Sequence, residues 1–154
     1  MSNNTNMQLK DMLIEHISGN GKSITQLPET MSTNTLYRGV SLNHFYHVGD
    51  IIKLSEIGHH FTYSNAIALD FARGADGQED IIFEISDTVK GLDIPELFFK
   101  FYDTSDDEMD SYKKMVEYEQ EFYIFNDYEF EIIDEEFEYG LFPLTIYRLK
   151  VRNS

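Results

Sequence analysis

The sequence predicts an α+β fold, because the first part of the chain shows helical periodicity and the later part is rich in strand-like segments. A length of 154 residues with 42% hydrophobic side chains is enough for one core, and neither an internal repeat nor a linker divides the chain. We therefore expect a single domain over residues 1–154. Within it, residues 1–6 are mostly small and polar, and we expect them to be disordered.

Two helices are expected from the spacing of apolar residues. The first covers residues 7–17, with Thr5 or Asn6 as its N-cap. The second covers residues 64–73 and begins at Ser64, a residue type that often caps helices. The apolar residues that share one face are Leu9, Met12, Leu13 and Ile17 in the first helix, and Ile67, Ala68, Phe71 and Ala72 in the second.

Short runs rich in β-branched and aromatic residues predict the strands. They lie at residues 36–40, 51–54, 81–85, 118–125, 130–133 and 144–151. The stretch 98–115 is acidic and aromatic and shows no clear period, so its secondary structure is not assigned from the sequence.

The chain is strongly acidic, and most of the excess lies in one region. The formal net charge is −16, and residues 103–138 hold fifteen acidic side chains against two lysines. Such a field repels nucleic acid and attracts a basic protein surface, so nucleic acid is not expected as a partner. The alternative interpretation is a solvated face that only keeps the protein soluble.

Cysteine is absent, which excludes disulfides and thiolate metal sites and is typical of the cytoplasm. The sequence also has no apolar run of about 20 residues and no apolar leader at its start. We therefore expect a soluble, cytoplasmic protein without a membrane partner.

Three segments carry the residues that indicate a function. Tyr37-Arg38-Gly39 offers a guanidinium that suits an anionic ligand, and residues 59–72 form a strand that leads into a helix. Glu119-Gln120-Glu121 places two carboxylates two residues apart on a predicted strand, so that both point to one face. Together, in this order, they predict one pocket for a phosphorylated molecule that contains ribose.

These segments resemble the arginine-directed mono-ADP-ribosyltransferases, most closely the small phage-encoded members that modify host RNA polymerase. The resemblance covers residues 36–150 and is carried by four motifs, at residues 36–40, 67–72, 119–122 and 145–147. It implies two packed, mostly antiparallel sheets around an NAD cleft, with a short N-terminal helical part.

The resemblance also implies the activity and its residues. NAD would be the substrate, no metal would be required, and ADP-ribose would pass to an arginine of a protein such as bacterial RNA polymerase or a translation protein. Glu121 would stabilise the sugar cation formed when nicotinamide leaves, Glu119 would orient and deprotonate the acceptor guanidinium, and Arg38 would hold the phosphates. The residues implied for NAD binding are Tyr37, Arg38, Gly39, His60, Thr62, Phe71 and Glu121.

The positions of the family's middle motif and of its target-choosing loop can also be located in this sequence. The family's Ser-Thr-Ser motif is absent, and the favoured register places His60-Phe61-Thr62 there, whereas a register two residues later would use Thr62-Tyr63-Ser64. In the favoured register His60 can donate a hydrogen bond to Glu121, while the adjacent His59 faces the other way, which makes the histidine pair a poor metal site. The family's target-choosing loop corresponds to residues 110–118, and the implied recognition residues are Tyr112, Met115, Tyr118 and Glu119.

Less specific interpretations stand beside each of these. Glu119 and Glu121 would be two solvated charges of an acidic strand, Arg38 would form a surface salt bridge, and the aromatic residues would join the core. At the level of function, the alternatives are a non-catalytic acidic binding protein that mimics nucleic acid and an NAD glycohydrolase that uses water as acceptor.

Overall fold

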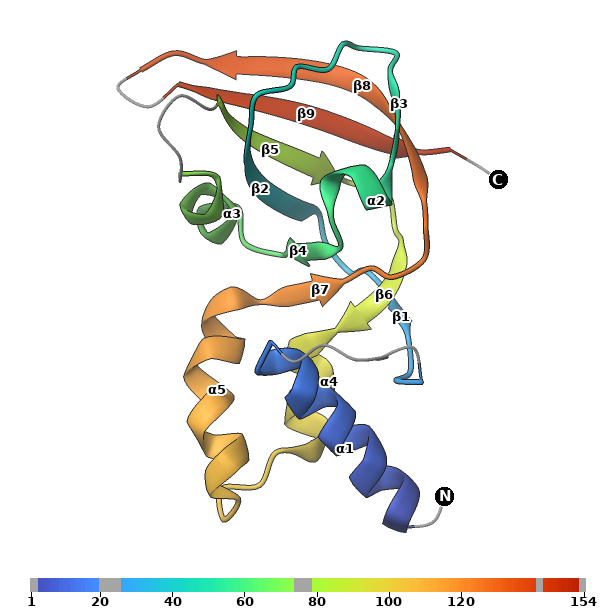
Figure 1. The fold of residues 1–154 in the computed structure, drawn as a ribbon, viewed down its shortest axis with the longest axis vertical. Coiled ribbons are helices and arrows are strands. Elements are labelled where there is room, and N and C mark those ends of the chain that lie inside the picture. The colour runs from blue at the N-terminus through green and yellow to red at the C-terminus, as the bar shows by residue number, and fades with distance from the viewer. Residues whose placement is uncertain (1–2, 20–25, 74–78, 141–142, 153–154) are drawn as a thin grey trace.

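The computed structural model describes residues 3–19, 26–73, 79–140 and 143–152, and its α+β architecture confirms the predicted fold class (Figure 1). The elements are, in chain order, α1 (Asn3–Ile17), β1 (Thr30–Met31), β2 (Leu36–Leu42), β3 (Ile51–Lys53), α2 (Leu54–Ile57), β4 (His60–Thr62), α3 (Asn65–Ala72), β5 (Glu79–Ile85), β6 (Lys90–Asp93), α4 (Ile94–Phe101), α5 (Asp107–Glu119), β7 (Glu121–Tyr123), β8 (Glu129–Glu138) and β9 (Leu144–Val151). No helix among these is long and apolar enough to cross a membrane.

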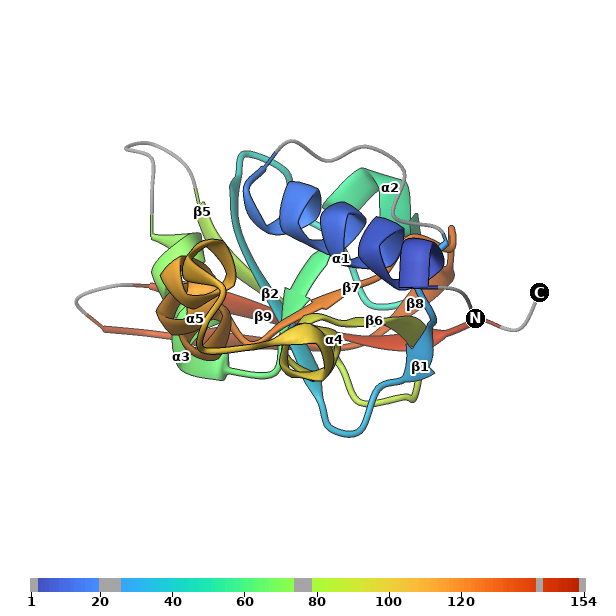
Figure 2. The same cartoon turned by 90° about the horizontal axis from the view of Figure 1, so that it is seen from below.

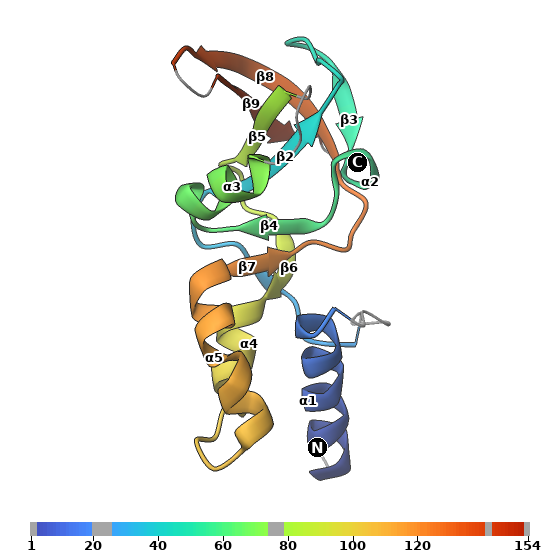
Figure 3. The ribbon, with the colours of Figure 1, turned by 60° about the vertical axis from the view of Figure 1, so that its left-hand side comes forward.

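The described strands form one sheet in the order β1-β6-β7-β4-β2-β5-β9-β8-β3. Strands β5 and β9 run parallel, and the other paired strands run antiparallel. A single residue pair, Tyr37 with Thr62, joins β2 to β4. The two expected sheets are therefore two arms of one sheet: a lower arm of β1, β6, β7 and β4, and an upper arm of β2, β5, β9, β8 and β3. Figure 3 shows β4 and β7 lying between the upper strands and the helices α1, α4 and α5.

The main core lies between the two arms of the sheet. Alternate side chains of a strand point to the same face, so each arm presents one apolar face to the other. Full burial of a large apolar side chain stabilises the fold by about 1.5–3 kcal/mol. The largest side chains of this core are fully buried: Phe61, Phe83, Phe122, Phe130 and Tyr147.

A helical body of α1, α4 and α5 lies at the opposite end of the molecule from the long strands (Figure 1), and its helices lie in front of the strands when the molecule is seen from below (Figure 2). It has its own apolar core, which includes Leu13 of α1, Phe98 of α4 and Val116 of α5. Leu92 of β6 belongs to the same core, which attaches the helical body to the lower arm.

Helix α3 packs directly against β2, and glycine is required at the contact. A Cβ atom at Gly39 would lie 1.7 Å from the carbonyl oxygen of Ala68, so any side chain there would push the helix off the strand. Ser64 caps the helix as predicted, since its hydroxyl oxygen accepts a hydrogen bond from the Ile67 backbone N–H at 3.3 Å. The first turn of α3 is thereby fixed beside β2.

Several predicted boundaries are wrong. Strand β8 continues to Glu138, five residues beyond the predicted end at residue 133. Helix α1 begins at Asn3, so the predicted caps at Thr5 and Asn6 lie inside it; residues 3–6, which we expected to be disordered, belong to the helix, and residues 1–2 lie outside the described residues. Residues 118 and 119 end helix α5 instead of starting a strand, and the unassigned stretch 98–115 belongs largely to α4 and α5. The Asp106 side chain caps α5, and the acidic residues of its first turn interact favourably with the positive end of the helix dipole. These contributions outweigh the local preference of Tyr118 for a strand.

Candidate active site

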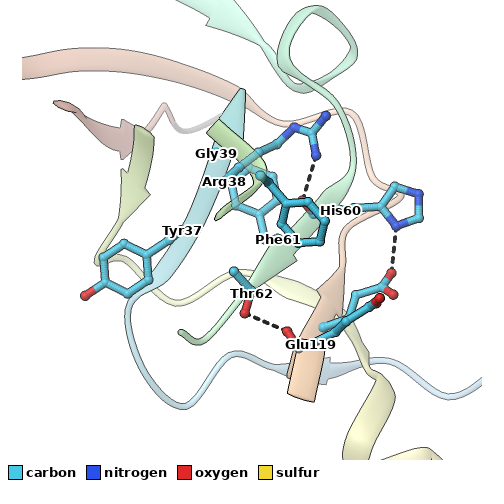
Figure 4. A pocket seen from close by; sticks show the side chains of 9 residues that line it. Tyr37, Arg38, Gly39, His60, Phe61, Thr62 and Glu119 are labelled. Carbon is cyan, nitrogen blue, oxygen red and sulfur yellow. Dashed lines mark hydrogen bonds and ion pairs between the residues drawn. The ribbon is translucent and has the colours of Figure 1, made fainter. Parts of the chain in front are cut away.

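One pocket, with a volume of about 380 Å³, lies where the two arms meet and is bordered by α3 and the end of α5. Its size is within the usual range for small-molecule sites. Figure 4 shows its side chains from β2, β4 and the end of α5. The lining includes every residue that the sequence analysis proposed for NAD binding, and their roles stay predictions: Tyr37, Arg38, Gly39, His60, Thr62, Phe71 and Glu121, with Phe61 and Glu119.

Glu119 and Glu121 both line the pocket, but not for the predicted reason. Glu119 is the last residue of α5 and Glu121 is the first of β7, so they do not share one strand face. Gln120 between them is left-handed, with φ 46° and ψ 47°, and it is the one described residue other than glycine with positive φ. Such conformations are uncommon for non-glycine residues and often mark functional sites. This turn, and not the pleat of a strand, brings both carboxylates to the pocket.

The end of β4 holds this turn in place. The Thr62 hydroxyl donates a hydrogen bond to the Glu119 carbonyl oxygen at 2.7 Å, as Figure 4 shows, and accepts one from the Ser64 backbone N–H at 3.0 Å. The Tyr63 backbone N–H donates to the Gln120 carbonyl oxygen at 3.1 Å. Thr62 is almost completely buried, and its hydroxyl holds the Glu119–Glu121 turn against the end of β4.

Glu121 is held by two imidazole rings. His16 Nε2 and His60 Nδ1 each lie 2.8 Å from the same carboxylate oxygen, Oε2. An ionised carboxylate only accepts hydrogen bonds, so both ring nitrogens carry the proton and donate. The predicted contact between His60 and Glu121 is thus present, in the favoured register of the middle motif. The Glu121 side chain is 15% exposed and the His16 side chain 4%, so the contact between His16 and Glu121 is largely shielded from water, whereas the His60 side chain is 60% exposed.

The environment separates the pKa values of the two carboxyl groups. Burial alone would raise the pKa of Glu121, but the hydrogen bonds from His16 and His60 outweigh it and lower that pKa to about 2. Burial and the neighbouring charge of Glu121 raise the pKa of Glu119 above its usual value. Divergent pKa values in a pair of carboxylates are typical of sites that assign the two groups different roles.

His16 was missed in the sequence analysis, although a signal for it exists. It lies three residues after Leu13 and seven after Leu9, so it falls on the apolar face of α1. A histidine there is buried, and it needs a polar partner from another element. The partner, Glu121, lies 105 positions further along the chain, beyond the reach of any local pattern.

Arg38 lies on β2, opposite β7 across β4. Its Nε donates to the Ile57 carbonyl oxygen and its Nη1 to the His60 carbonyl oxygen, the latter at 2.9 Å. Gly58 leaves room for the guanidinium, because a Cβ atom there would lie 2.5 Å from Nη2, and its φ of +100° also favours glycine. Burial lowers the pKa of Arg38, but an arginine keeps its charge at any physiological pH. His60 therefore contacts Arg38 through its backbone and Glu121 through its ring.

The residues predicted for target recognition lie on α5, which is a helix and not the expected loop. Tyr112 packs against the core of the helical body, so the alternative interpretation, that these aromatics join the core, holds for this residue. Met115 and Tyr118 are exposed, and the Tyr118 hydroxyl donates to the Asp70 carboxylate at 2.9 Å. This bond joins the end of α5 to α3 beside the pocket.

The remaining histidine of the predicted pair faces away from Glu121. His59 Nδ1 lies 2.7 Å from the Ile124 carbonyl oxygen, which can only accept, so this nitrogen carries the proton. The adjacent histidines therefore have different partners, and they do not form a metal site together. Among the described residues, His16, His60 and Glu121 are the groups placed so that they could hold a metal ion.

Comparison with known proteins supports the fold. No protein-family model and no curated protein matches the chain. Among solved structures, the chain is similar to Vis, an ADP-ribosyltransferase toxin from Vibrio splendidus. The complex of Vis with inhibitor M6 superposes with a TM-score of 0.54 at 13% identity, covering 99% of this chain and 74% of Vis. The agmatine complex gives 0.51 at 13% identity over 98% and 72%. This likeness confirms the predicted ADP-ribosyltransferase fold.

Proposed function

We propose that the protein is a mono-ADP-ribosyltransferase that moves ADP-ribose from NAD to an arginine of a target protein and releases nicotinamide. The observation that carries the proposal is Glu121, an ionised carboxylate held by two imidazoles in the wall of a pocket that also contains Arg38. The fold agrees with the proposal, but a fold alone does not determine a function. The argument for the activity therefore rests on the groups that the pocket provides.

In the proposed reaction, the bond between the ribose C1′ and the nicotinamide nitrogen breaks, and nicotinamide leaves with the bonding electrons. The ribose carbon becomes cationic, as in glycoside cleavage, and the negative charge of Glu121 stabilises it. Because His16 and His60 already orient this carboxylate, little reorganisation is needed when the charge develops. Arg38 would bind the negatively charged diphosphate of NAD.

The acceptor guanidinium would be bound by Glu119. A nitrogen of the acceptor arginine forms the new bond to C1′ and loses a proton, for which Glu119 is the base. The raised pKa of Glu119 improves its ability to take up that proton. For the arginine we favour a basic protein surface, such as that of bacterial RNA polymerase or a translation protein, because the net charge of −16 would attract it.

The proposal is tested by incubating the protein with radiolabelled NAD and a bacterial lysate, followed by gel autoradiography and by measurement of nicotinamide. A second reaction replaces the lysate with agmatine, the guanidinium compound bound to Vis in one of the similar structures. We expect labelled acceptor and free nicotinamide with the native protein, and neither with Glu121→Gln.

Glu117→Gln is the matched control, because Glu117 is an exposed glutamate of the same segment that does not line the pocket. It should retain transfer. Intact NAD in every reaction of the native protein would contradict the proposal and favour the acidic binding protein. Free ADP-ribose without labelled acceptor would instead favour the NAD glycohydrolase.

A further inference from the structure

Three potential metal ligands converge at the pocket from distant parts of the chain. They are His16 Nε2 of α1, His60 Nδ1 of β4 and a carboxylate oxygen of Glu121 in β7, and all three atoms lie within 4.8 Å of one another. We propose that this His16–His60–Glu121 cluster binds a divalent transition-metal ion of the zinc class. The sequence analysis expected no metal, because the reaction implied by the resemblance requires none and because the adjacent His59 and His60 face opposite ways; it did not include His16.

The ligand types select the kind of metal. Two imidazoles and one carboxylate form a common three-ligand set for zinc, and such a set leaves a coordination position open for water or another ligand. Calcium and magnesium prefer oxygen ligands, and two of the three groups here are nitrogen donors. Since His60 and Glu121 also line the pocket, the open position would face the pocket cavity.

The two imidazole rings already direct a nitrogen toward the same atom, since His16 Nε2 and His60 Nδ1 each lie 2.8 Å from Oε2 of Glu121. The rings are stacked, with an interplanar angle of 14° and centroids 5.5 Å apart. The Tyr123 ring contacts both of them edge-on, at centroid distances of 4.7 Å from His16 and 4.8 Å from His60. Packing against this tyrosine orients both rings before a metal binds, which lowers the cost of forming the site.

The two ring nitrogens must move closer together to form metal bonds. In a tetrahedral site, zinc–nitrogen bonds of about 2.0–2.1 Å place these nitrogens about 3.3 Å apart, so the movement from the upper limit of 4.8 Å in the structure is about 1.5 Å or less. The His60 side chain is 60% exposed, so its ring has room for this shift toward the buried His16. In each ring the proton moves to the other nitrogen when the metal takes the lone pair, so coordination need not change the net protonation of the imidazoles.

Metal binding would compete with the proposed reaction. This consequence rests on the proposed function, whereas the binding site itself does not. Coordination would occupy the carboxylate oxygen of Glu121 that His16 and His60 now orient, and it would add positive charge where a sugar cation must form. We therefore expect zinc to inhibit ADP-ribose transfer and a chelator to restore it.

The binding is tested directly with cobalt, whose visible absorption becomes intense in a tetrahedral site that would otherwise hold zinc. Untagged protein is stripped with EDTA, dialysed and titrated with Co²⁺, followed by Zn²⁺, with no NAD present. We expect one Co²⁺ per chain, displaced by Zn²⁺. The absorption should be lost in His16→Ala, in His60→Ala and in Glu121→Gln.

His44→Ala is the matched control, since His44 is an exposed histidine outside the cluster, and it should bind cobalt as the native chain does. Circular dichroism shows whether each variant is folded, and His16→Gln replaces His16→Ala if the latter is not. Binding of zinc to the native protein is measured separately by isothermal titration calorimetry. If the native protein shows neither the cobalt absorption nor a heat of zinc binding, that result overturns the proposal. So does undiminished binding in folded His16 and His60 variants.

A separate assay distinguishes this proposal from the proposed function. If cobalt binds as expected but the metal-free protein leaves NAD and acceptors unchanged, the metal site stands and the transferase assignment fails. If transfer occurs in EDTA and no metal binds, the transferase assignment stands and the metal site fails.

Discussion

Two clusters of charged and hydrogen-bonded side chains lie on the same sheet and differ mainly in their access to water. In the pocket, Glu121 accepts hydrogen bonds from His16 and His60, each at 2.8 Å. On the upper arm, Arg148 of β9 forms ion pairs of 2.6–3.1 Å with three carboxylates: Asp134, Glu136 and Glu84. The distances are similar, so geometry alone does not separate a functional cluster from a structural one.

Exposure separates most of their members. The side chains of Arg148, Asp134 and Glu136 are 35%, 55% and 48% exposed, against 15% for Glu121 and 4% for His16. Glu84 at 18% and His60 at 60% are the exceptions in the two clusters. Around an exposed group, water replaces a lost partner, and so such ion pairs contribute little to stability. Around Glu121, a lost partner leaves a largely buried charge unpaired, which costs much more. Glu121 and His60 of the first cluster also line the pocket, whereas none of the residues that line this pocket belongs to the Arg148 cluster.

After Glu121→Gln, the largest loss of transfer is expected when the second carboxylate of the pocket is neutralised. Glu119→Gln should lower transfer to agmatine by on the order of 10²- to 10⁴-fold, because it removes the proposed base for the acceptor. Slow hydrolysis of NAD should persist, since Glu121 is unchanged. Rates of ADP-ribosyl-agmatine and of free ADP-ribose formation measure the two reactions. Glu136→Gln, in the exposed cluster, should leave both rates at the native value; equal loss in the two variants would remove the distinction between the clusters.

A smaller effect is expected from the buried histidine that orients Glu121. His16→Ala should lower the free energy of unfolding by about 1.5–3 kcal/mol, because a hydrogen bond to a charged group is lost. Urea unfolding in EDTA measures this change. Transfer should also fall, mainly through kcat, whereas KM for NAD should change little. Normal kcat in a destabilised His16→Ala would show that His16 supports the fold without positioning Glu121.

Sequence analysis found the residues that line this pocket but missed the buried histidine, His16, that holds Glu121. The β2 residues Tyr37, Arg38 and Gly39 were found because their short motif and strand pattern are local. His16 was not, because its role depends on a contact between α1 and β7. The relation of Glu119 to Glu121 was predicted for the wrong reason, since the helical spacing of Met109, Tyr112 and Val116 carries α5 up to Glu119.

The pH dependence of the two reactions sharpens the contrast within the pocket. Glu119 has a raised pKa and Glu121 one of about 2, so on acidification Glu119 takes up a proton first. The rate of transfer should fall about tenfold per pH unit below the pKa of Glu119. The rate of NAD hydrolysis should be maintained at more acidic pH values, because Glu121 stays ionised there. Initial rates of both reactions, measured in EDTA between pH 4 and pH 8, test this. Identical acid limbs for transfer and hydrolysis would contradict separate roles for the two carboxylates.

The smallest effect is expected in the exposed cluster. Arg148→Ala should lower the free energy of unfolding by about 1 kcal/mol or less, because two of its three carboxylate partners, Asp134 and Glu136, are well exposed to water, and high salt should reduce the difference further. Urea unfolding at low salt and in 1 M NaCl measures it. If Arg148→Ala lowered the free energy of unfolding by more than His16→Ala does, exposure would not explain the difference in stability contribution between the two clusters.

The central claim is that Arg38 and Glu121 border one NAD site. It is tested most directly by a crystal structure of Glu121→Gln with NAD, in which the reaction is blocked and the substrate stays intact. We expect the dinucleotide in the pocket at the junction of the two arms, with its diphosphate near Arg38 and the nicotinamide ribose against residue 121. NAD bound at another place, or a pocket that stays empty at saturating NAD, would contradict the account.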